Sequence, residues 1–258
     1  MLLKPSPIFD DYWCFAFKRQ EILRNQHFSN REVHYPIDDL ILRTYKFTNC
    51  YRATDRVSQF LIKNVIYPQK AFTPEDTFLR ILLFKVFNKI ETWQWLESQL
   101  GEINRNTYSS SLVSKLLDER RSEKKKIYSP AYIMPSGKSV FGYDLKHENH
   151  LSLLDQMLKD EIDRRIWKNR HLKSVYEALL AYPSIGPFLA MQYAIDLAYS
   201  PFALFNESQF IVAGPGAIRG IKKCFDDIGD YSTSDVVAYM AENQSTFFER
   251  NGLAFKGL

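Results

Sequence analysis

Residues 171–200, HLKSVYEALLAYPSIGPFLAMQYAIDLAYS, decide the fold. Apolar residues recur at helical spacing on both sides of a short break, which predicts two helices, the second beginning at Pro187. Ile185 and Gly186 lie in the turn between them. The pattern is typical of a helix-hairpin-helix, in which a glycine lets the backbone approach a DNA phosphate and free N–H groups attract the anion. A plain helical hairpin is the alternative interpretation.

Helical periodicity extends over most of the remaining chain. It predicts helices over 12–25 and 106–121, and a helix that Thr73 caps and Pro74 begins. Residues 129–145, SPAYIMPSGKSVFGYDL, break the pattern and predict a small β-hairpin or an irregular excursion. We therefore expect a mainly α protein with a helix-hairpin-helix, a single unit over 1–258 with helical lobes 1–125 and 145–258 and a cleft between them.

Composition excludes several classes of protein. The chain has 258 residues, 45% of them hydrophobic, and no apolar run long enough to span a membrane. Its first residues, MLLKPSPIFDDYW, do not form an export signal, so we expect a cytoplasmic protein with three reduced cysteines. The net charge of +4 permits a polyanionic partner. The histidines have no metal-ligand spacing, and neither a metal, a cofactor nor a protein partner is implied.

The segment after the second helix, FNESQFIVAGPGAIRGIKKCF (205–225), carries a further signal. Base-excision glycosylases with this hairpin place a catalytic Asp here, whereas Ala213 and Gly214 follow the expected strand FIV. Phe188 occupies the position of the Schiff-base Lys, which excludes that mechanism. Gly214 and Gly216 instead predict a tight loop that could hold a phosphate.

Five strings carry a resemblance over nearly the whole chain: FKRQEILRNQ (17–26), DDLILRTYKFTNCYRATDRVSQFLI (38–62), AYIMPSG (131–137), IGPFLAMQYAIDLAYS (185–200) and FIVAGPGAIRGIKKCF (210–225). They resemble the alpha-glutamyl/putrescinyl-thymine pyrophosphorylase family, also known as DNA base hypermodification proteins or the helical domain of hydroxymethyluracil DNA kinases. The resemblance implies a variant glycosylase fold and activity on modified pyrimidines in phage DNA. Relatives often carry an acid where this chain has Gln209.

Candidate site residues follow from these motifs. Cleavage of an N-glycosidic bond needs a carboxylate near the sugar, and a pyrimidine edge suits an amide. The catalytic candidates are Asp196, Glu207, Asp55 and Asn49. The candidates for a base pocket are Phe17, Asn49, Tyr132 and Gln209. The candidates for contacts with double-stranded DNA are Arg19, Arg24, Arg52, Arg56, Ile185, Gly186, Gly214, Gly216, Arg219 and Lys222. A buried network of Asn49, arginine and Asp55 that only fixes a helix remains the alternative for the first motif.

Three functions compete. The first is a monofunctional DNA glycosylase, a hydrolase that acts by base flipping and excises a hypermodified pyrimidine, best glucosylated hydroxymethylcytosine, in anti-phage defence. We place it first because the sequence holds no GxxxxGK[ST] loop and fits one glycosylase-like unit. The second is a transferase that attaches an amino acid or polyamine to diphosphorylated hydroxymethyluracil, which the missing Asp favours. The third is a DNA-binding module without catalysis.

Overall fold

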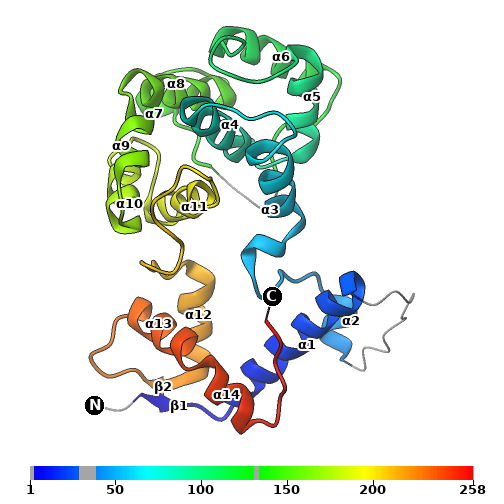
Figure 1. Cartoon of the computed structure of the whole chain (residues 1–258), viewed down its shortest axis with the longest axis vertical. Helices are drawn as coiled ribbons and strands as arrows, with labels where there is room; N and C mark the ends of the chain where they lie inside the picture. Colours follow the sequence, from blue (N-terminus) through cyan, green and yellow to red (C-terminus); the bar gives the residue numbers. More distant parts are fainter. Residues whose placement is uncertain (1–2, 29–38, 131–133, 258) are drawn as a thin grey trace. The chain divides into compact units, whose positions relative to one another are not determined.

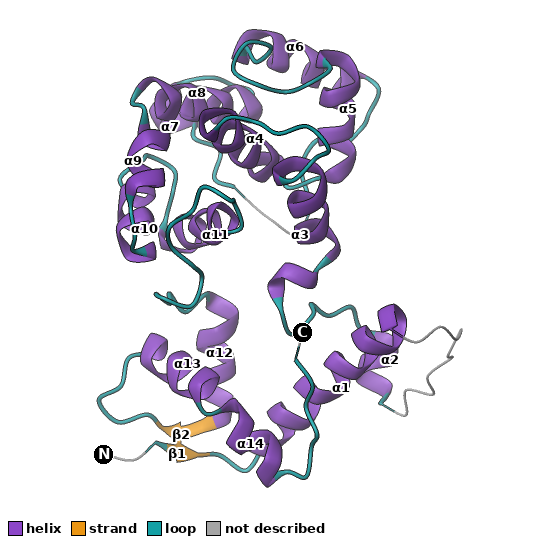
Figure 2. Cartoon of the chain, viewed as in Figure 1, coloured by secondary structure: helices purple, strands orange, loops and turns teal. Residues whose placement is uncertain are grey.

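The computed structural model describes residues 3–28, 39–130 and 134–257. Within these ranges the protein is mainly helical, with fourteen α-helices and one small two-stranded sheet (Figures 1 and 2). The chain divides into two compact units. Unit 1 joins residues 1–55 to 211–258, and unit 2 holds residues 56–210.

Unit 1 brings the two ends of the sequence together. Its elements are β1 (Lys4–Pro5), α1 (Phe9–Phe28), α2 (Leu40–Thr44), the 3-10 helix η1 (Arg52–Thr54), α12 (Pro215–Cys224), β2 (Phe225–Asp227), α13 (Thr233–Glu242) and α14 (Gln244–Arg250). Strands β1 and β2 are antiparallel, with Lys4 opposite Asp227. Trp13 of α1 stacks on Phe247 of α14 at 5.0 Å between ring centroids, inside a core that also includes Ile221 and Val236. Burial of these rings holds the distant segments together.

Unit 2 is built around two buried helices. Its elements are α3 (Arg56–Phe60), the π-helix η2 (Leu61–Ile66), α4 (Pro74–Phe87), α5 (Ile90–Leu100), α6 (Ser110–Ser122), α7 (Lys138–Phe141), α8 (Lys146–Lys159), α9 (Ile162–Lys168), α10 (Leu172–Leu180) and α11 (Pro187–Ala198). Every residue of α4 from Thr77 to Phe87 is buried. Helix α11 packs against both α4 and α10. Arg80 of α4 donates hydrogen bonds to the carbonyls of Asn64, Val65 and Ile103, and so fixes the end of the π-helix.

Several predicted elements are confirmed. Thr73 caps α4 by accepting a hydrogen bond from the Asp76 N–H, and Pro74 is the first helical residue. The two helices of residues 171–200 form as α10 and α11, so the helical hairpin is present. The more specific resemblance to a DNA glycosylase fold stays a prediction.

Two predictions about local structure are wrong. The second arm of the expected β-hairpin is helix α7, because Gly137 and Gly142 adopt positive φ at its two ends and close a single helical turn. Residues 131–133 of the first arm lie outside the described residues. The expected strand FIV has no strand pairing. The two compact units have other boundaries than the expected lobes 1–125 and 145–258, and α1 packs with α12 and α14 within unit 1.

Candidate functional site

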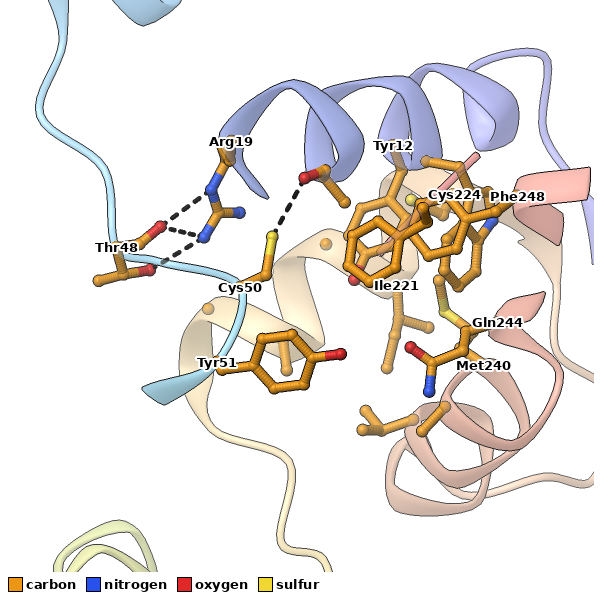
Figure 3. Close-up of a pocket in the computed structure, with 18 residues that line it drawn as sticks. Tyr12, Arg19, Thr48, Cys50, Tyr51, Ile221, Cys224, Met240, Gln244 and Phe248 are labelled. Carbon is orange, nitrogen blue, oxygen red and sulfur yellow. Dashed lines mark hydrogen bonds between the residues drawn. The ribbon is translucent and has the colours of Figure 1, made fainter. Parts of the chain in front are cut away.

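A pocket of about 580 Å³ opens within unit 1. We call it the unit 1 pocket. Helices α1, α12, α13 and α14, the segment 48–51 and Phe255 near the C-terminus line it (Figure 3). The residues that line it are Tyr12, Trp13, Ala16, Arg19, Thr48, Cys50, Tyr51, Gly216, Ala217, Gly220, Ile221, Cys224, Val237, Met240, Ala241, Gln244, Phe248 and Phe255. Pockets of this volume hold small molecules and cofactors in many proteins.

Small residues on one face of α12 leave the pocket open. Gly216 and Gly220 are four residues apart and therefore share a helix face. A Cβ atom added at either position would meet nothing within 4 Å. Neither glycine has positive φ. The backbone therefore does not require glycine at these positions, and the consequence of their missing side chains is free volume in the pocket.

Arg19 supplies the positive charge of the pocket. Its Nε donates to the Thr48 carbonyl at 2.9 Å, and its Nη2 donates to the same carbonyl and, at 3.3 Å, to Thr48 Oγ1 (Figure 3). The guanidinium group also lies 5.9 Å from the Phe47 ring centroid. These contacts hold the cation in one place while donors remain on Nη1. Among the described lining residues there is no Asp or Glu, so the pocket favours an anion.

The start of α12 adds to this positive potential. Gly214 caps the helix without a side-chain hydrogen bond, and Gly216 and Ala217 follow Pro215 in its first turn. Amide groups in the first turn of a helix have no partner within the helix. Both residues line the pocket, and the described hydrogen bonds include none from their N–H groups. They are available donors for an anion.

Two cysteines line the pocket as neutral thiols. Cys50 Sγ donates to the Ala16 carbonyl at 3.1 Å. Burial raises the pKa of Cys50 more than the nearby Arg19 lowers it, and burial raises the pKa of Cys224 as well. Because the thiolate is the reactive form, neither cysteine is an activated nucleophile.

The Asn49 motif is occupied by local hydrogen bonds. Asn49 N–H donates to Asp55 Oδ1 at 2.9 Å, and Asn49 Nδ2 donates to the Thr54 carbonyl at 2.9 Å. These two hydrogen bonds resemble the alternative interpretation of the motif, a local network with a structural role. The network fixes a loop, however, and not a helix. Arg52 and Arg56 do not share a helix face as expected, because Asp55 is extended between η1 and α3.

The other two acidic candidates belong to unit 2. Asp196 is buried, and its Oδ2 lies 2.8 Å from Lys85 Nζ. Glu207 is exposed in a loop and accepts a hydrogen bond from the Tyr199 hydroxyl at 3.0 Å. Asn49 and Asp55 thus belong to one compact unit, and this pair belongs to the other.

The candidates for a base pocket also fall in different places. Phe17 packs against the core of unit 1. Gln209 fastens a loop to the start of α10, since its Oε1 accepts from Leu172 N–H at 3.1 Å and its Nε2 donates to the Arg170 carbonyl at 3.2 Å. Tyr132 lies outside the described residues. None of the described candidates for a base pocket lines the unit 1 pocket.

The DNA-contact candidates differ in how they are held. Ile185 is buried in the hairpin turn, while a Cβ atom at Gly186 would meet nothing within 4 Å. Arg24 Nη1 donates weakly to the Gly257 carbonyl at 3.4 Å. Arg219 and Lys222 are exposed on α12, and within the described ranges no ion pair involves either of them. The latter two cations are free to contact a polyanion.

Sequence reasoning missed much of the unit 1 pocket. It identified Arg19 and Gly216, and it noted Tyr12 and Trp13 as aromatic residues near motifs, but it did not identify Tyr51 or the residues from α13 and α14. Tyr51 follows Asn49 in the motif string, which was a usable signal. Gln244 had none, because its proximity to α1 depends on the packing of the two chain ends.

Two further properties hold for the described part of the chain. No helix there is long and apolar enough to cross a membrane. No group of three or more His, Cys, Asp or Glu residues within it could hold a metal ion.

Comparison with known proteins places the chain in context. Residues 6–258 match the family described as the helical domain of 5-hmdU DNA kinase. The 5-hmdU DNA kinase of Bacillus phage SP10 is 26% identical over 271 residues, which cover 96% of this chain and 41% of that protein. The chain therefore spans less than half the length of this relative. No solved structure matches the chain.

These matches overturn the leading expectation from sequence. The relative is named for a kinase, a transferase that adds a group to DNA, and not for a hydrolase that removes a base. The prediction of a monofunctional DNA N-glycosylase is therefore wrong, and base flipping by such a hydrolase loses its support. The physical reason is that a helical hairpin determines how DNA can be approached and does not determine which bond reacts. The absence of an Asp directly after residues 210–212 agrees with this correction, because glycosylases with this hairpin place their catalytic Asp there.

Proposed function

The chain belongs to the helical-domain family of the 5-hmdU DNA kinases, and from this membership we propose that it acts in DNA base hypermodification. Its substrate is a 5-hydroxymethyluracil base in phage DNA that already carries phosphate on the hydroxymethyl group. The match over residues 6–258 is the observation that carries the proposal. Because the match is to the helical domain alone, we assign the chain a step on the modified base and not the phosphorylation for which the relative is named.

The proposed step is the transfer of an amine. The amine nitrogen of an amino acid or polyamine attacks the exocyclic methylene carbon of diphosphorylated hydroxymethyluracil. The C–O bond to the diphosphate breaks, pyrophosphate leaves with the bonding electron pair, and the nitrogen releases a proton to solvent. The N-glycosidic bond stays intact. Charge accumulates on the leaving pyrophosphate, so fixed positive groups would accelerate this reaction.

The geometry of unit 1 supports this chemistry. Arg19 and the first amides of α12 line one pocket, and the described lining holds no carboxylate that would repel a diphosphate. Exposed Arg219 and Lys222 lie on the same helix α12 and are available for the DNA backbone. The proposed partner is therefore DNA itself.

The test is a product analysis. The full chain is incubated with duplex DNA that contains thymine, hydroxymethyluracil or diphosphorylated hydroxymethyluracil, each with and without a mixture of amino acids and polyamines. The DNA is then digested to nucleosides, which are identified by mass spectrometry. We expect a new aminomethyl nucleoside only from the diphosphorylated DNA with an amine present. DNA binding without any new nucleoside would contradict the transfer and leave only a binding module.

A further inference from the structure

We propose that the unit 1 pocket binds a phosphorylated 5-hydroxymethyluracil nucleotide, with its anionic group at Arg19 and its uracil edge at Gln244 and Tyr51. The choice of base rests on the proposed function. The choice of an anionic ligand with a ring does not, because it follows from the residues of the pocket.

The anionic end is defined by fixed donors. Three hydrogen bonds, among them those at 2.9 Å and 3.3 Å, tie Arg19 to Thr48 through Nε and Nη2, which leaves Nη1 available for a ligand. The N–H groups of Gly216 and Ala217 are a second set of donors on the same pocket. A guanidinium group beside helix-start amides is a common way to hold a phosphate or a carboxylate.

The ring end is defined by polar groups that lack partners. In Figure 3 the Tyr51 hydroxyl and the Gln244 amide point toward one another across the pocket. The described hydrogen bonds include none from either side chain. A glutamine amide presents one donor and one acceptor, and the uracil edge presents an imide N–H beside a carbonyl, so the two can pair through two hydrogen bonds. The Tyr51 hydroxyl can then reach the second carbonyl.

Trp13 gives an independent indication of a ligand. It lines the pocket, its side chain is only 4% exposed, and its Nε1 has no hydrogen-bond partner within the described structure. A buried indole N–H without a partner is costly, and most buried polar atoms in proteins are paired. A polar ligand atom in the pocket is the partner that this group lacks.

The remaining walls fit a flat, partly apolar body. Met240, Phe248 and Ile221 form an apolar side, and the missing side chains of Gly216 and Gly220 leave room beside them. The volume of about 580 Å³ accommodates a mononucleotide. A polyamine is a poor ligand for this pocket, because among the described lining residues nothing offers a negative charge.

Titration calorimetry on the full chain tests the proposal. The probes are 5-hydroxymethyl-deoxyuridine phosphorylated on its hydroxymethyl group (the nucleotide), unphosphorylated 5-hydroxymethyl-deoxyuridine (the nucleoside), inorganic phosphate and putrescine. We expect the nucleotide to bind about tenfold or more tighter than the nucleoside, since hydrogen bonds to a charged group are stronger than hydrogen bonds between neutral groups. We expect weak binding of phosphate and none of putrescine.

Variants locate the binding site. Arg19→Gln should reduce nucleotide affinity to that of the nucleoside, and Gln244→Met should weaken both ligands. The matched control is Lys18→Gln, which removes one charge from the neighbouring position on α1, outside the pocket lining. Because Arg19 also anchors Thr48, the variant Gly220→Leu provides a second test by filling the pocket. Circular dichroism confirms that each variant is folded.

Two sources could supply this ligand, a free nucleotide or a nucleotide within DNA. Displacement of the bound nucleotide by a single-stranded oligonucleotide that contains one 5-hydroxymethyluracil phosphorylated on its hydroxymethyl group identifies DNA as the source, and no displacement identifies the free nucleotide. Equal affinity for nucleotide and nucleoside, or the same loss in Lys18→Gln as in Arg19→Gln, would overturn the proposal. Nucleotide binding without amine transfer would refute the proposed function alone, and amine transfer unchanged in Arg19→Gln would refute this inference alone.

Discussion

Lys85 Nζ lies 2.8 Å from Asp196 Oδ2, and both side chains are almost completely buried in unit 2. The pair joins α4 to α11, the two helices at the centre of that unit. Asp196 is one of the four catalytic candidates from the sequence. Its burial and its cationic partner indicate that the role is to hold these helices together.

Asp196→Ala should destabilise the protein strongly. Removal of one partner leaves the Lys85 ammonium buried without a counter-charge, which typically costs about 3–5 kcal/mol in the free energy of unfolding. Urea denaturation followed by circular dichroism measures this loss. The double variant Lys85→Met/Asp196→Leu removes both charges and should recover most of the stability. An unchanged urea midpoint in Asp196→Ala would show that the ion pair does not matter for folding.

Alanine at two glycine positions should have opposite effects. Gly220 lies within α12 with space around it, so Gly220→Ala should stabilise the protein by about 0.5–1 kcal/mol through helix propensity. Gly101 ends α5 with a φ of +70°, so Gly101→Ala should destabilise it by about 1–2 kcal/mol through backbone strain. Both values come from urea midpoints. A loss of stability in Gly220→Ala would mean that the space beside α12 is already filled.

Stability should fall in mild acid because of His150. Its Nε2 donates to the Pro135 carbonyl at 2.6 Å, its Nδ1 accepts from the Tyr128 hydroxyl at 2.8 Å, and burial lowers its pKa to about 4. The unfolded chain takes up a proton near pH 6.5, whereas the folded chain takes it up only near pH 4. The contribution of neutral, buried His150 to the free energy of unfolding is therefore fully present above pH 6.5. It is lost as the pH falls toward 4, by about 2 kcal/mol between pH 7 and pH 5.

Urea midpoints at pH 7 and pH 5 measure the effect of His150. His150→Gln should reduce the difference between the two midpoints. Tyr128→Phe is the matched control, since it removes a hydrogen-bond partner and leaves the imidazole buried, so the difference should persist. The same difference in wild type and His150→Gln would assign the acid sensitivity to other groups.

The basic loop at the end of α6 is expected to contact DNA phosphates. Lys124, Lys125 and Lys126 are exposed, and no ion pair to any of them occurs in the described ranges. Replacing all three by glutamine should weaken DNA binding and lower the magnitude of the slope of log affinity against log salt by about 2.7, since each phosphate contact contributes about 0.9. Fluorescence anisotropy at several salt concentrations measures the slope. Lys138→Gln is the control, because Lys138 pairs with Asp144. An unchanged slope in the triple variant would exclude this loop from the interface.

Local chemistry explains which parts of the fold were predictable from sequence. The Thr73 cap and the hairpin helices depend on neighbouring residues, and they formed as expected. The π-helix Leu61–Ile66 was not predictable, because it depends on Arg80, which reaches its carbonyls from another helix. Periodicity shows which face of a helix is buried but not which partner covers it.

The same limit applies to the candidate site. Arg19 and Gly216 belonged to recognisable motifs, whereas Gln244 joins them only because the C-terminal helices pack on α1. The Gln20 amide, which donates to the Lys256 carbonyl at 3.1 Å, shows how closely the two chain ends lie. The family assignment came from the match over residues 6–258 and not from the geometry, because fold and chemistry are separable.

The intact mass of one modified oligonucleotide distinguishes amine transfer to the base from removal of the base. A duplex with a single diphosphorylated hydroxymethyluracil is incubated with the protein and one amine at a time, and the modified strand is weighed by mass spectrometry. If amine transfer takes place, we expect the strand to lose pyrophosphate, gain the amine and keep its base. A strand that loses the whole base and leaves an abasic site would contradict it, as would a strand that is unchanged with every amine.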